Sequence, residues 1–185
     1  MTQAHSSKEL IIERAQRQDA PALAELGAKT FTGKFGHLYS AENLSRFLTE
    51  SHSQAAYEAL LSDADTALWV SRDSDGKLAA YAVAARGTSL PIDGDASGAM
   101  EIKRLYVDQA YQGAGLGRQL MDVMLAWISE AGDRPIYLSV YKYNDGAQRF
   151  YQRYGFSEVK EITFLVGDHV DPELLYGRPD SAGDF

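Results

Sequence analysis

A glycine-rich turn is the part of this sequence whose residue types point most directly to chemistry. Gly113, Gly115 and Gly117 follow a segment rich in β-forming residues, 101–107, and precede an amphipathic stretch, 116–131. A glycine turn that leads into a helix leaves several backbone N–H groups without intrahelical partners. The helix dipole adds partial positive charge at the same place, so this turn predicts a phosphate or pyrophosphate ligand.

Two common phosphate-binding motifs do not fit the turn. A dinucleotide fingerprint that starts at Gly113 would need a third glycine where the chain has Arg118, and a P-loop would need a lysine after Gly117. The pattern that fits is Gln112-x-x-Gly115-x-Gly117, placed directly after a strand. It resembles the acyl-CoA pyrophosphate loop of the GNAT superfamily of N-acetyltransferases. A tight strand-to-helix turn without a ligand is the alternative.

A second block further along the chain resembles the other signature of this superfamily. That signature is a strand followed by N-x-x-A-x-x-F/L-Y-x-x-x-G-F, and the matching residues are Asn144, Ala147, Phe150, Tyr151, Gly155 and Phe156. An ordinary amphipathic helix with a glycine cap at Gly155 would explain the apolar spacing. It would not explain why Asn144 and Tyr151 occur together with the first block.

The resemblance implies a single domain over residues 1–185 with a GNAT-type α/β sandwich. The sheet is expected to be mixed and mostly antiparallel, and to splay between its fourth and fifth strands. The pattern of apolar stretches and turns agrees, because it predicts the order β-α-α-β-β-β-α-β-α-β-β. The predicted strands are 10–14, 66–72, 77–86, 101–107, 136–140, 157–166 and 174–176.

Helices and loops are expected between these strands. Asp19 and Ser40 are candidate N-caps for two helices, a short helical piece is expected near 57–61, and 116–131 is the longest helical stretch. We expect a glycine-broken aromatic loop over 31–39, a turn over 167–172 and a loose tail over 1–9.

The resemblance also implies acetyl-CoA as the co-substrate, bound largely by the main chain. It places the pantetheine arm against the backbone of Leu105, Tyr106 and Val107, with the Val107 N–H polarising the thioester carbonyl. It places the pyrophosphate on the backbone amides of Gln112, Gly113, Ala114, Gly115, Leu116, Gly117 and Arg118. Asn144 would contact the cofactor or fix the strand-to-helix turn.

Two side chains are candidates for the proton transfers of N-acetylation. Tyr151 matches the general acid position of the family, where its phenol would protonate the departing thiolate. Glu101 is the candidate base, acting through water, because the strand carries it close to the expected splay. A structural glutamate on the strand is the alternative for Glu101, core packing is the alternative for Tyr151, and Tyr154 is the fallback acid.

Composition narrows the classes of partner. A formal net charge of -8 argues against nonspecific nucleic-acid binding and favours small cationic acceptors such as polyamines, although solubility alone would also explain it. The sequence has no cysteine, which removes disulfides and thiolate metal sites; we predict no metal. It has no apolar run long enough for a membrane span and a polar start, so a cytoplasmic protein is expected.

The acceptor is the least determined part of the function. The segment 31–61 is similar to bacterial spermidine/spermine acetyltransferases, and His37 and Tyr39 are candidates for lining an amine pocket or for simple loop packing. We expect an enzyme that moves an acetyl group to a primary amine by direct attack in a ternary complex. The alternative is an inactive acyl-CoA-binding sensor. Family members are frequently dimers, which leaves a homodimer open.

Overall fold

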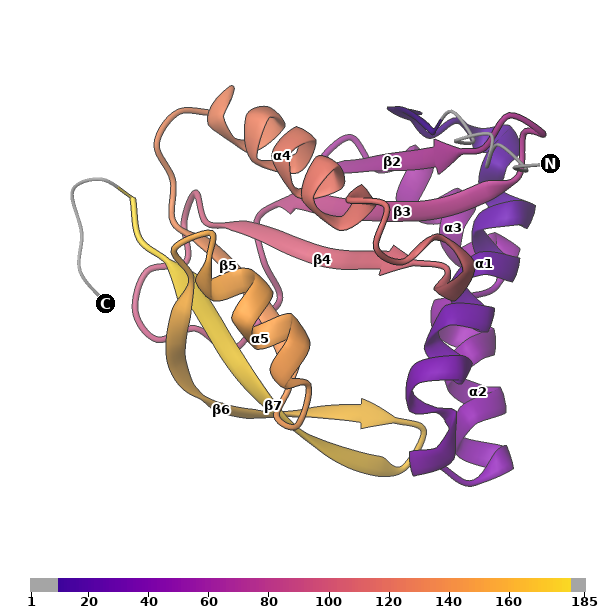
Figure 1. Cartoon of the computed structure of the whole chain (residues 1–185). Helices are drawn as coiled ribbons and strands as arrows, with labels where there is room; N and C mark the ends of the chain where they lie inside the picture. The colour runs from indigo at the N-terminus through magenta and orange to yellow at the C-terminus, as the bar shows by residue number, and fades with distance from the viewer. Residues whose placement is uncertain (1–9, 181–185) are drawn as a thin grey trace, which may run out of the picture.

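The computed structural model describes residues 10–180, and these form one seven-stranded sheet with helices on both faces (Figure 1). The strands lie in the order β1-β2-β3-β4-β5-β7-β6, and every neighbouring pair is antiparallel except β4 and β5. The strands are β1 (Ile11–Arg14), β2 (Thr66–Arg72), β3 (Leu78–Arg86), β4 (Met100–Val107), β5 (Ile136–Tyr141), β6 (Ser157–Val166) and β7 (His169–Arg178). The helices are α1 (Ala20–Phe35), α2 (Ala41–Ser51), α3 (Gln54–Ser62), α4 (Leu116–Ser129) and α5 (Asp145–Gln152).

This architecture confirms the expected fold class and the order of the strands, and the short helical piece expected near 57–61 is a third helix, α3, before β2. The predicted N-cap at Ser40 is confirmed, because its side chain accepts a hydrogen bond from the Asn43 N–H at the start of α2. Asp19 precedes α1 as expected, but its side chain makes no capping hydrogen bond to that helix. The expected tail, 1–9, lies outside the described residues.

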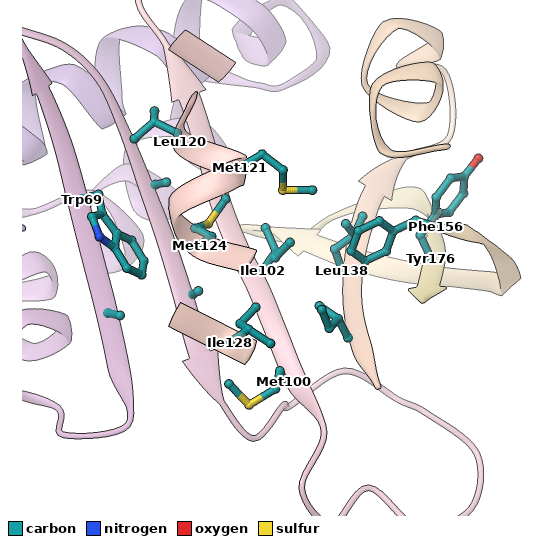
Figure 2. Packing of buried hydrophobic residues seen from close by; sticks show 14 of the residues in the cluster. Trp69, Met100, Ile102, Leu120, Met121, Met124, Ile128, Leu138, Phe156 and Tyr176 are labelled. Atoms are coloured by element: carbon teal, nitrogen blue, oxygen red, sulfur yellow. The ribbon is translucent and has the colours of Figure 1, made fainter. Parts of the chain in front are cut away.

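Side chains of the central strands point alternately to the two faces of the sheet, and a hydrophobic core forms on each face. On β2, Trp69 points to the face covered by α4, and Leu68 points to the face covered by α1 and α3. Small alanines on β3 leave room for α4, whose Met121 and Met124 pack towards Ile102 of β4 (Figure 2). The buried residues of α4 are Leu116, Leu120, Met121, Met124 and Ile128. The helical spacing in the sequence therefore predicted this face correctly.

The sheet divides between β4 and β5. These strands pair only at Met100 with Ile136 and at Glu101 with Tyr137, and Figure 1 shows them diverging beyond that point. The rest of β4 pairs with β3 on one edge, and β5 continues along β7. Backbone groups along 102–107 therefore face the opening on the β5 side, which is the splay that the resemblance implied.

A bulge in β4 changes which side chains face the opening. Ala84 of β3 pairs with Ile102 and Val83 pairs with Arg104, so Lys103 is an extra residue on β4. Because side chains alternate along a strand, one extra residue reverses the face of every residue that follows it. Arg104 and Tyr106 consequently lie on the opposite face from Leu105 and Val107.

The expected loop over 31–39 is wrong for its first half. α1 continues to Phe35, and a short 3-10 turn, Gly36–Leu38, follows it. Phe31 and Phe35 lie one helical turn apart with ring centroids separated by 5.3 Å. Their packing offsets the weak helix propensity of Gly33, which costs about 1 kcal/mol relative to alanine in a helix.

The expected turn over 167–172 is also wrong, because the last strand begins earlier. β7 starts at His169, which pairs with Val166, so only Gly167 and Asp168 form the turn. Pro172 pairs with Thr163 of β6, and on its other side the β5–β7 pairing reaches only Glu173, so Pro172 lies just past the end of that ladder.

The tip of this hairpin packs against α2. Asn43 accepts a hydrogen bond from the Asp168 N–H at 3.0 Å, Arg46 pairs with Asp168 at 2.5 Å, and the rings of Phe47 and Phe164 meet edge to face. Gly167 has a φ of 61°, and a Cβ there would lie 2.7 Å from the Cα of Asn43. The two parts of the molecule thus meet again on the far side of the split.

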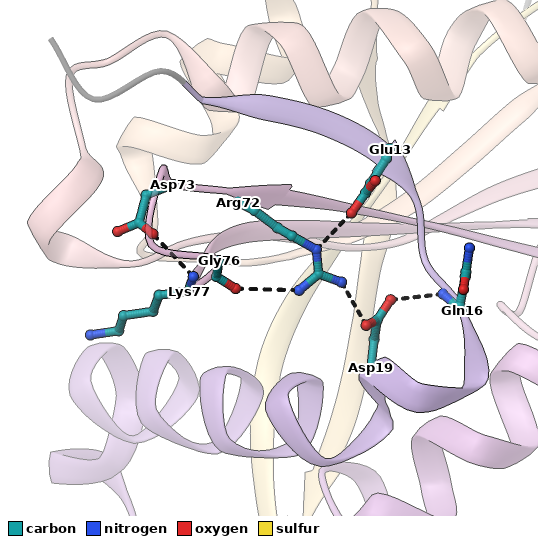
Figure 3. A network of polar contacts seen from close by, with 7 residues as sticks. All are labelled: Glu13, Gln16, Asp19, Arg72, Asp73, Gly76 and Lys77. Carbon is teal, nitrogen blue, oxygen red and sulfur yellow. Dashed lines mark hydrogen bonds and ion pairs between the residues drawn. The ribbon is translucent and has the colours of Figure 1, made fainter.

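A polar network around Arg72 fixes the turn that supports the glycine loop. Arg72, at the end of β2, contacts Glu13 of β1 at 2.6 Å, Asp19 before α1 at 2.5 Å and the Gly76 carbonyl at 3.4 Å (Figure 3). The next residue, Asp73, is buried and accepts hydrogen bonds from the Lys77 N–H. This network holds the β2–β3 turn in place beside the segment that follows β4.

Candidate active site

The predicted pyrophosphate loop combines left-handed glycines with a free helix start. Gly113 and Gly115 have φ values of 84° and 78°, a region that glycine enters without steric cost. Gly115 is the N-cap of α4, and the first helical hydrogen bond runs from the Gln119 N–H to the Gly115 carbonyl. The N–H groups of residues 116–118 precede that bond, so they are free to bind an anion. The loop residues 112–115 are exposed.

Two buried carboxylates hold the segment before this loop. Asp108 is 2% exposed, accepts a hydrogen bond from the Ala110 N–H and pairs with Lys29 of α1 at 2.6 Å. Tyr111 donates a hydrogen bond of 2.5 Å to Asp73 in the β2–β3 turn. The position of the glycine loop is therefore tied to both α1 and the network of Figure 3.

A cavity of about 460 Å³ lies on the other side of β4 from α4. The residues that β4 contributes to it are Glu101, Lys103, Arg104 and Tyr106. Consecutive residues 103 and 104 both line it, at the bulge in β4. Phe31, Phe47 and Phe164 add aromatic walls from α1, α2 and β6, and Ser139 and Glu173 line it from β5 and β7.

Tyr151 lies on α5 and is half-buried against the core that α4 also covers. Its ring meets Phe150 and Phe156 edge to face, at centroid distances of 5.4 and 6.1 Å. Burial, together with the nearby Tyr106 phenol, raises the pKa of Tyr151 well above its usual value. The phenol is therefore protonated at neutral pH, and within residues 10–180 its hydroxyl has no hydrogen-bond partner.

Glu101 lines the cavity but is firmly held. It is 6% exposed, and its Oε2 accepts hydrogen bonds from the Thr88 hydroxyl at 2.8 Å and the Ser89 N–H at 3.2 Å. Its Oε1 lies 3.4 Å from the Lys103 ammonium. These contacts fix the position of the Glu101 carboxyl group at the cavity wall.

The sequence-based reasoning missed two charged residues of the cavity, Arg104 and Glu173. Arg104 Nη1 and Glu173 Oε2 are both buried without a hydrogen-bond partner in the described part of the chain. Burial is the main cause that raises the pKa of Glu173, opposed by a hydrogen bond with Ser139. A signal for Arg104 was present, because Ile102, Leu105 and Val107 break strict alternation and so indicate a bulge between them.

Arg104 belongs to a buried aromatic network beneath the cavity. The Tyr57 hydroxyl lies 2.9 Å from His52 Nδ1 and 2.7 Å from the Tyr81 hydroxyl, and the Arg104 guanidinium carbon lies 5.2 Å from the Tyr57 ring centroid. Burial, with a further contribution from Arg104, lowers the pKa of His52 to about 3, so the ring is neutral. The network approaches α1 closely at Gly27, where a Cβ would lie 2.1 Å from the Tyr57 oxygen.

The remaining predicted residues have structural contacts that the sequence only partly indicated. Asn144 is the N-cap of α5, and its side chain accepts a hydrogen bond from the Ala147 N–H at 3.4 Å. The Arg118 side chain is 81% exposed, 3.8 Å from Asp122. The Tyr154 hydroxyl donates to Asp122 at 3.1 Å, so this tyrosine contacts the surface of α4 and not the cavity.

The two candidate acceptor residues lie to the side of the cavity. His37 is exposed in the turn after α1. Tyr39 stacks on Phe31 with the ring planes 7° apart and donates a hydrogen bond of 2.5 Å to Asp171. Neither residue lines the cavity described above, so their role in acceptor binding stays a prediction.

Comparison with known families decides the identity of this arrangement. The profile of the Acetyltransferase (GNAT) family matches residues 34–156, which include both the glycine loop and the Asn144–Phe156 block. The chain belongs to this family. Its sequence is 30% identical over 160 residues to an uncharacterized N-acetyltransferase of Mycobacterium bovis, covering 86% of this chain and 97% of the relative.

Other relatives of this GNAT acetyltransferase agree with the fold. The structure of the PaiA N-acetyltransferase of Thermoplasma acidophilum in complex with coenzyme A superposes with a TM-score of 0.72, at 16% identity, covering 92% of this chain and 99% of that one. A Bacillus subtilis spermine/spermidine N(1)-acetyltransferase is 35% identical over only 69 residues, which is 37% of this chain and 45% of that enzyme.

The residues of this GNAT acetyltransferase fit acetyl-CoA, the co-substrate of the family. The left-handed glycines and free amides at the start of α4 suit a pyrophosphate, and the unpaired edge of β4 offers backbone groups to an extended arm. Within residues 10–180, no cluster of three or more His, Asp or Glu side chains is placed to hold a metal ion. The same residues include no helix that is long and apolar enough to span a membrane.

Proposed function

We propose that this GNAT acetyltransferase acetylates the primary amine of a small acceptor that binds in the cavity beside β4. Tyr106 is the observation that carries the proposal. Its side chain lines the cavity, and its phenol is close enough to Tyr151 to affect the pKa of that residue. The candidate acid and the acceptor cavity therefore lie next to each other at the split of the sheet.

The co-substrate supplies the acetyl group as a thioester that an unprotonated amine can attack. The backbone of Leu105, Tyr106 and Val107 borders the split, and in our proposal it aligns the thioester, with the Val107 N–H stabilising negative charge on its oxygen. The amides of residues 112–118 hold the pyrophosphate. Asn144 keeps the start of α5, and with it Tyr151, in position.

Tyr151 and Glu101 divide the two proton transfers in this proposal. The buried Tyr151 phenol is protonated and has no protein partner among the described residues, so it can donate to the departing sulfur. Glu101 is fixed at the wall of the cavity by Thr88 and Lys103, where it can accept the proton of the amine through a water molecule.

Thiol release from acetyl-CoA, measured with a panel of amines, tests this function. We expect Tyr151→Phe to lower kcat by about 10²-fold or more while calorimetry shows unchanged coenzyme A affinity. Tyr154→Phe is the matched control, because its hydroxyl bonds to Asp122 on the protein surface. Tight coenzyme A binding without thiol release for any amine would instead identify a non-catalytic binding protein.

Polyamines are a second acceptor class. The net charge of -8 and the partial similarity to the Bacillus subtilis enzyme favour them. The cationic side chain of Arg104, which has no ion-pair partner among residues 10–180, weighs against a purely cationic acceptor.

A further inference from the structure

Arg104 is a cation beside the cavity without a carboxylate partner. Its side chain lines the cavity, and none of the ion pairs among residues 10–180 includes it. Its Nη1 is buried without a hydrogen-bond partner in the same range. A buried charge of this kind is costly unless a counter-charge is supplied.

The protein groups around Arg104 do not supply that counter-charge. The rings in contact with it or near it are those of Tyr57, Tyr81 and Tyr106, and burial raises the pKa of each, so all three are neutral. His52 is neutral as well, because burial and Arg104 lower its pKa to about 3. Lys103, the other cation of the cavity, already has Glu101 as its partner at 3.4 Å.

Glu173 provides the opposite charge on another wall. It lines the same cavity from β7, on the far side of the split, and its Oε2 has no partner in the described part of the chain. Tyr106 lines the same cavity and is near both groups, since Arg104 lowers and Glu173 raises the pKa of its phenol. The cavity wall therefore carries an unpaired guanidinium nitrogen from β4 and an unpaired carboxyl oxygen from β7.

We propose that the acceptor is a small amino acid-like molecule, with a carboxylate that binds Arg104 and an amine that binds at Glu173. This inference rests on the proposed N-acetyltransferase function and adds the chemical class of its acceptor. An acceptor of this kind pairs both unmatched groups at once. A polyamine pairs with Glu173 but leaves Arg104 facing a second cation.

Matched pairs of acceptors test the proposal. Each amino acid is compared with its own carboxamide, and spermidine is included, with thiol release and calorimetric binding as two separate readouts. A charge-assisted hydrogen bond contributes about 1.5–3 kcal/mol, so the amino acid should bind about 10-fold to 100-fold more tightly than its carboxamide. Equal or tighter binding of the carboxamide or of spermidine would overturn the proposal.

Variants at Arg104 then test whether this residue causes the preference for a carboxylate. In Arg104→Gln we expect the preference for the carboxylate to fall to within about threefold of unity, with KM raised for the amino acid and not for the carboxamide. Arg104→Lys, which keeps the charge beside Tyr57, should restore part of the preference. Lys103→Gln is the matched control and should keep the full preference, because Lys103 already pairs with Glu101.

These experiments distinguish failure of the proposed N-acetyltransferase function from failure of the acceptor proposal. If no amine gives thiol release, the proposed function fails, and calorimetry still reports whether the cavity takes an amino acid. If thiol release is found but Arg104→Gln weakens the amino acid and its carboxamide equally, Arg104 has only a structural role and the acceptor proposal fails. Thermal unfolding of each variant confirms that it is folded before its kinetics are interpreted.

Discussion

Lys29 of α1 donates a hydrogen bond of 2.6 Å to the buried carboxylate of Asp108, which follows β4. Burial opposes ionisation of Asp108, but Lys29 and the Ala110 N–H outweigh it and lower the pKa of that carboxyl. The contact joins the helix that covers one face of the sheet to the segment that leads into the glycine loop. The stability of the site thus depends on a residue far from it in the sequence.

Replacing Lys29 with methionine should therefore loosen the cofactor side of the site. Because Asp108 is 2% exposed, Lys29→Met leaves a buried charge without its partner, and we expect a loss of about 1–3 kcal/mol in the free energy of unfolding. Urea unfolding measures this loss, and calorimetry should show weaker coenzyme A binding. Lys34→Met, at an exposed position of the same helix, is the control and should change stability by less than about 0.5 kcal/mol.

Two glycines of α1 should respond to alanine in opposite directions. At Gly27 a Cβ would lie 2.1 Å from the Tyr57 oxygen and 2.5 Å from His52 Nδ1, so Gly27→Ala should cost about 1–3 kcal/mol through overpacking. At Gly33 a Cβ would meet nothing within 4 Å, so Gly33→Ala should gain about 0.5–1 kcal/mol from helix propensity. Thermal unfolding of the two variants compares them directly. A gain at both positions would contradict the close contact at Gly27.

The buried His52 should make stability fall in mild acid. Its folded pKa of about 3 is below the ordinary histidine pKa of 6.5, so between these values the unfolded chain binds a proton that the folded chain does not. The contribution of His52 to the free energy of unfolding is fully present above the pKa of histidine in the unfolded chain. It is lost as the pH falls below that pKa. From about pH 7.5 to about pH 5 the expected loss is on the order of 2 kcal/mol. His52→Gln should flatten this part of the profile, and an unchanged slope would refute the assignment.

The contact between the β6–β7 turn and α2 predicts a third pair of variants. Gly167 and Gly76 both have positive φ, so alanine at either position is strained by about 1–2 kcal/mol. A Cβ at Gly167 would also lie 2.7 Å from the Asn43 Cα, whereas one at Gly76 would meet nothing within 4 Å. Gly167→Ala should therefore cost more than Gly76→Ala and should raise KM for the acceptor, because Phe47 and Phe164 line the cavity at this contact. Equal effects of both substitutions on KM would contradict this.

Local patterns in the sequence were sufficient to predict the elements that, in our proposal, hold the cofactor. The glycines before α4, the amphipathic face of that helix and the N-cap at Asn144 depend on neighbouring residues, so short windows reveal them. The same windows failed at 31–39, where the packing of Phe31 and Phe35 continues α1 past Gly33. They also failed at 167–172, where strand pairing continues to a two-residue turn.

The acceptor cavity could not be predicted in this way, because its walls come from distant parts of the chain. Arg104 and Glu173 meet the same cavity from β4 and β7, and only the split of the sheet brings them to it. Glu101 was identified from its place near the splay, but its ties to Thr88 and Ser89 depend on a loop with no regular pattern. The position of each charge follows from strand register, which sequence spacing alone does not fix.

The bulge at Lys103 determines which side chains of β4 face the cavity. If Lys103 instead paired in regular register, with no bulge, strict alternation would turn Leu105 and Val107 to the cavity and Arg104 and Tyr106 to the methionines of α4. The cavity beside β4 would then be lined by hydrophobic side chains, and the Arg104 guanidinium would lie in the hydrophobic core. The irregular pairing at Lys103 thus gives the cavity its polar lining and leaves the hydrophobic side chains of β4 to the core.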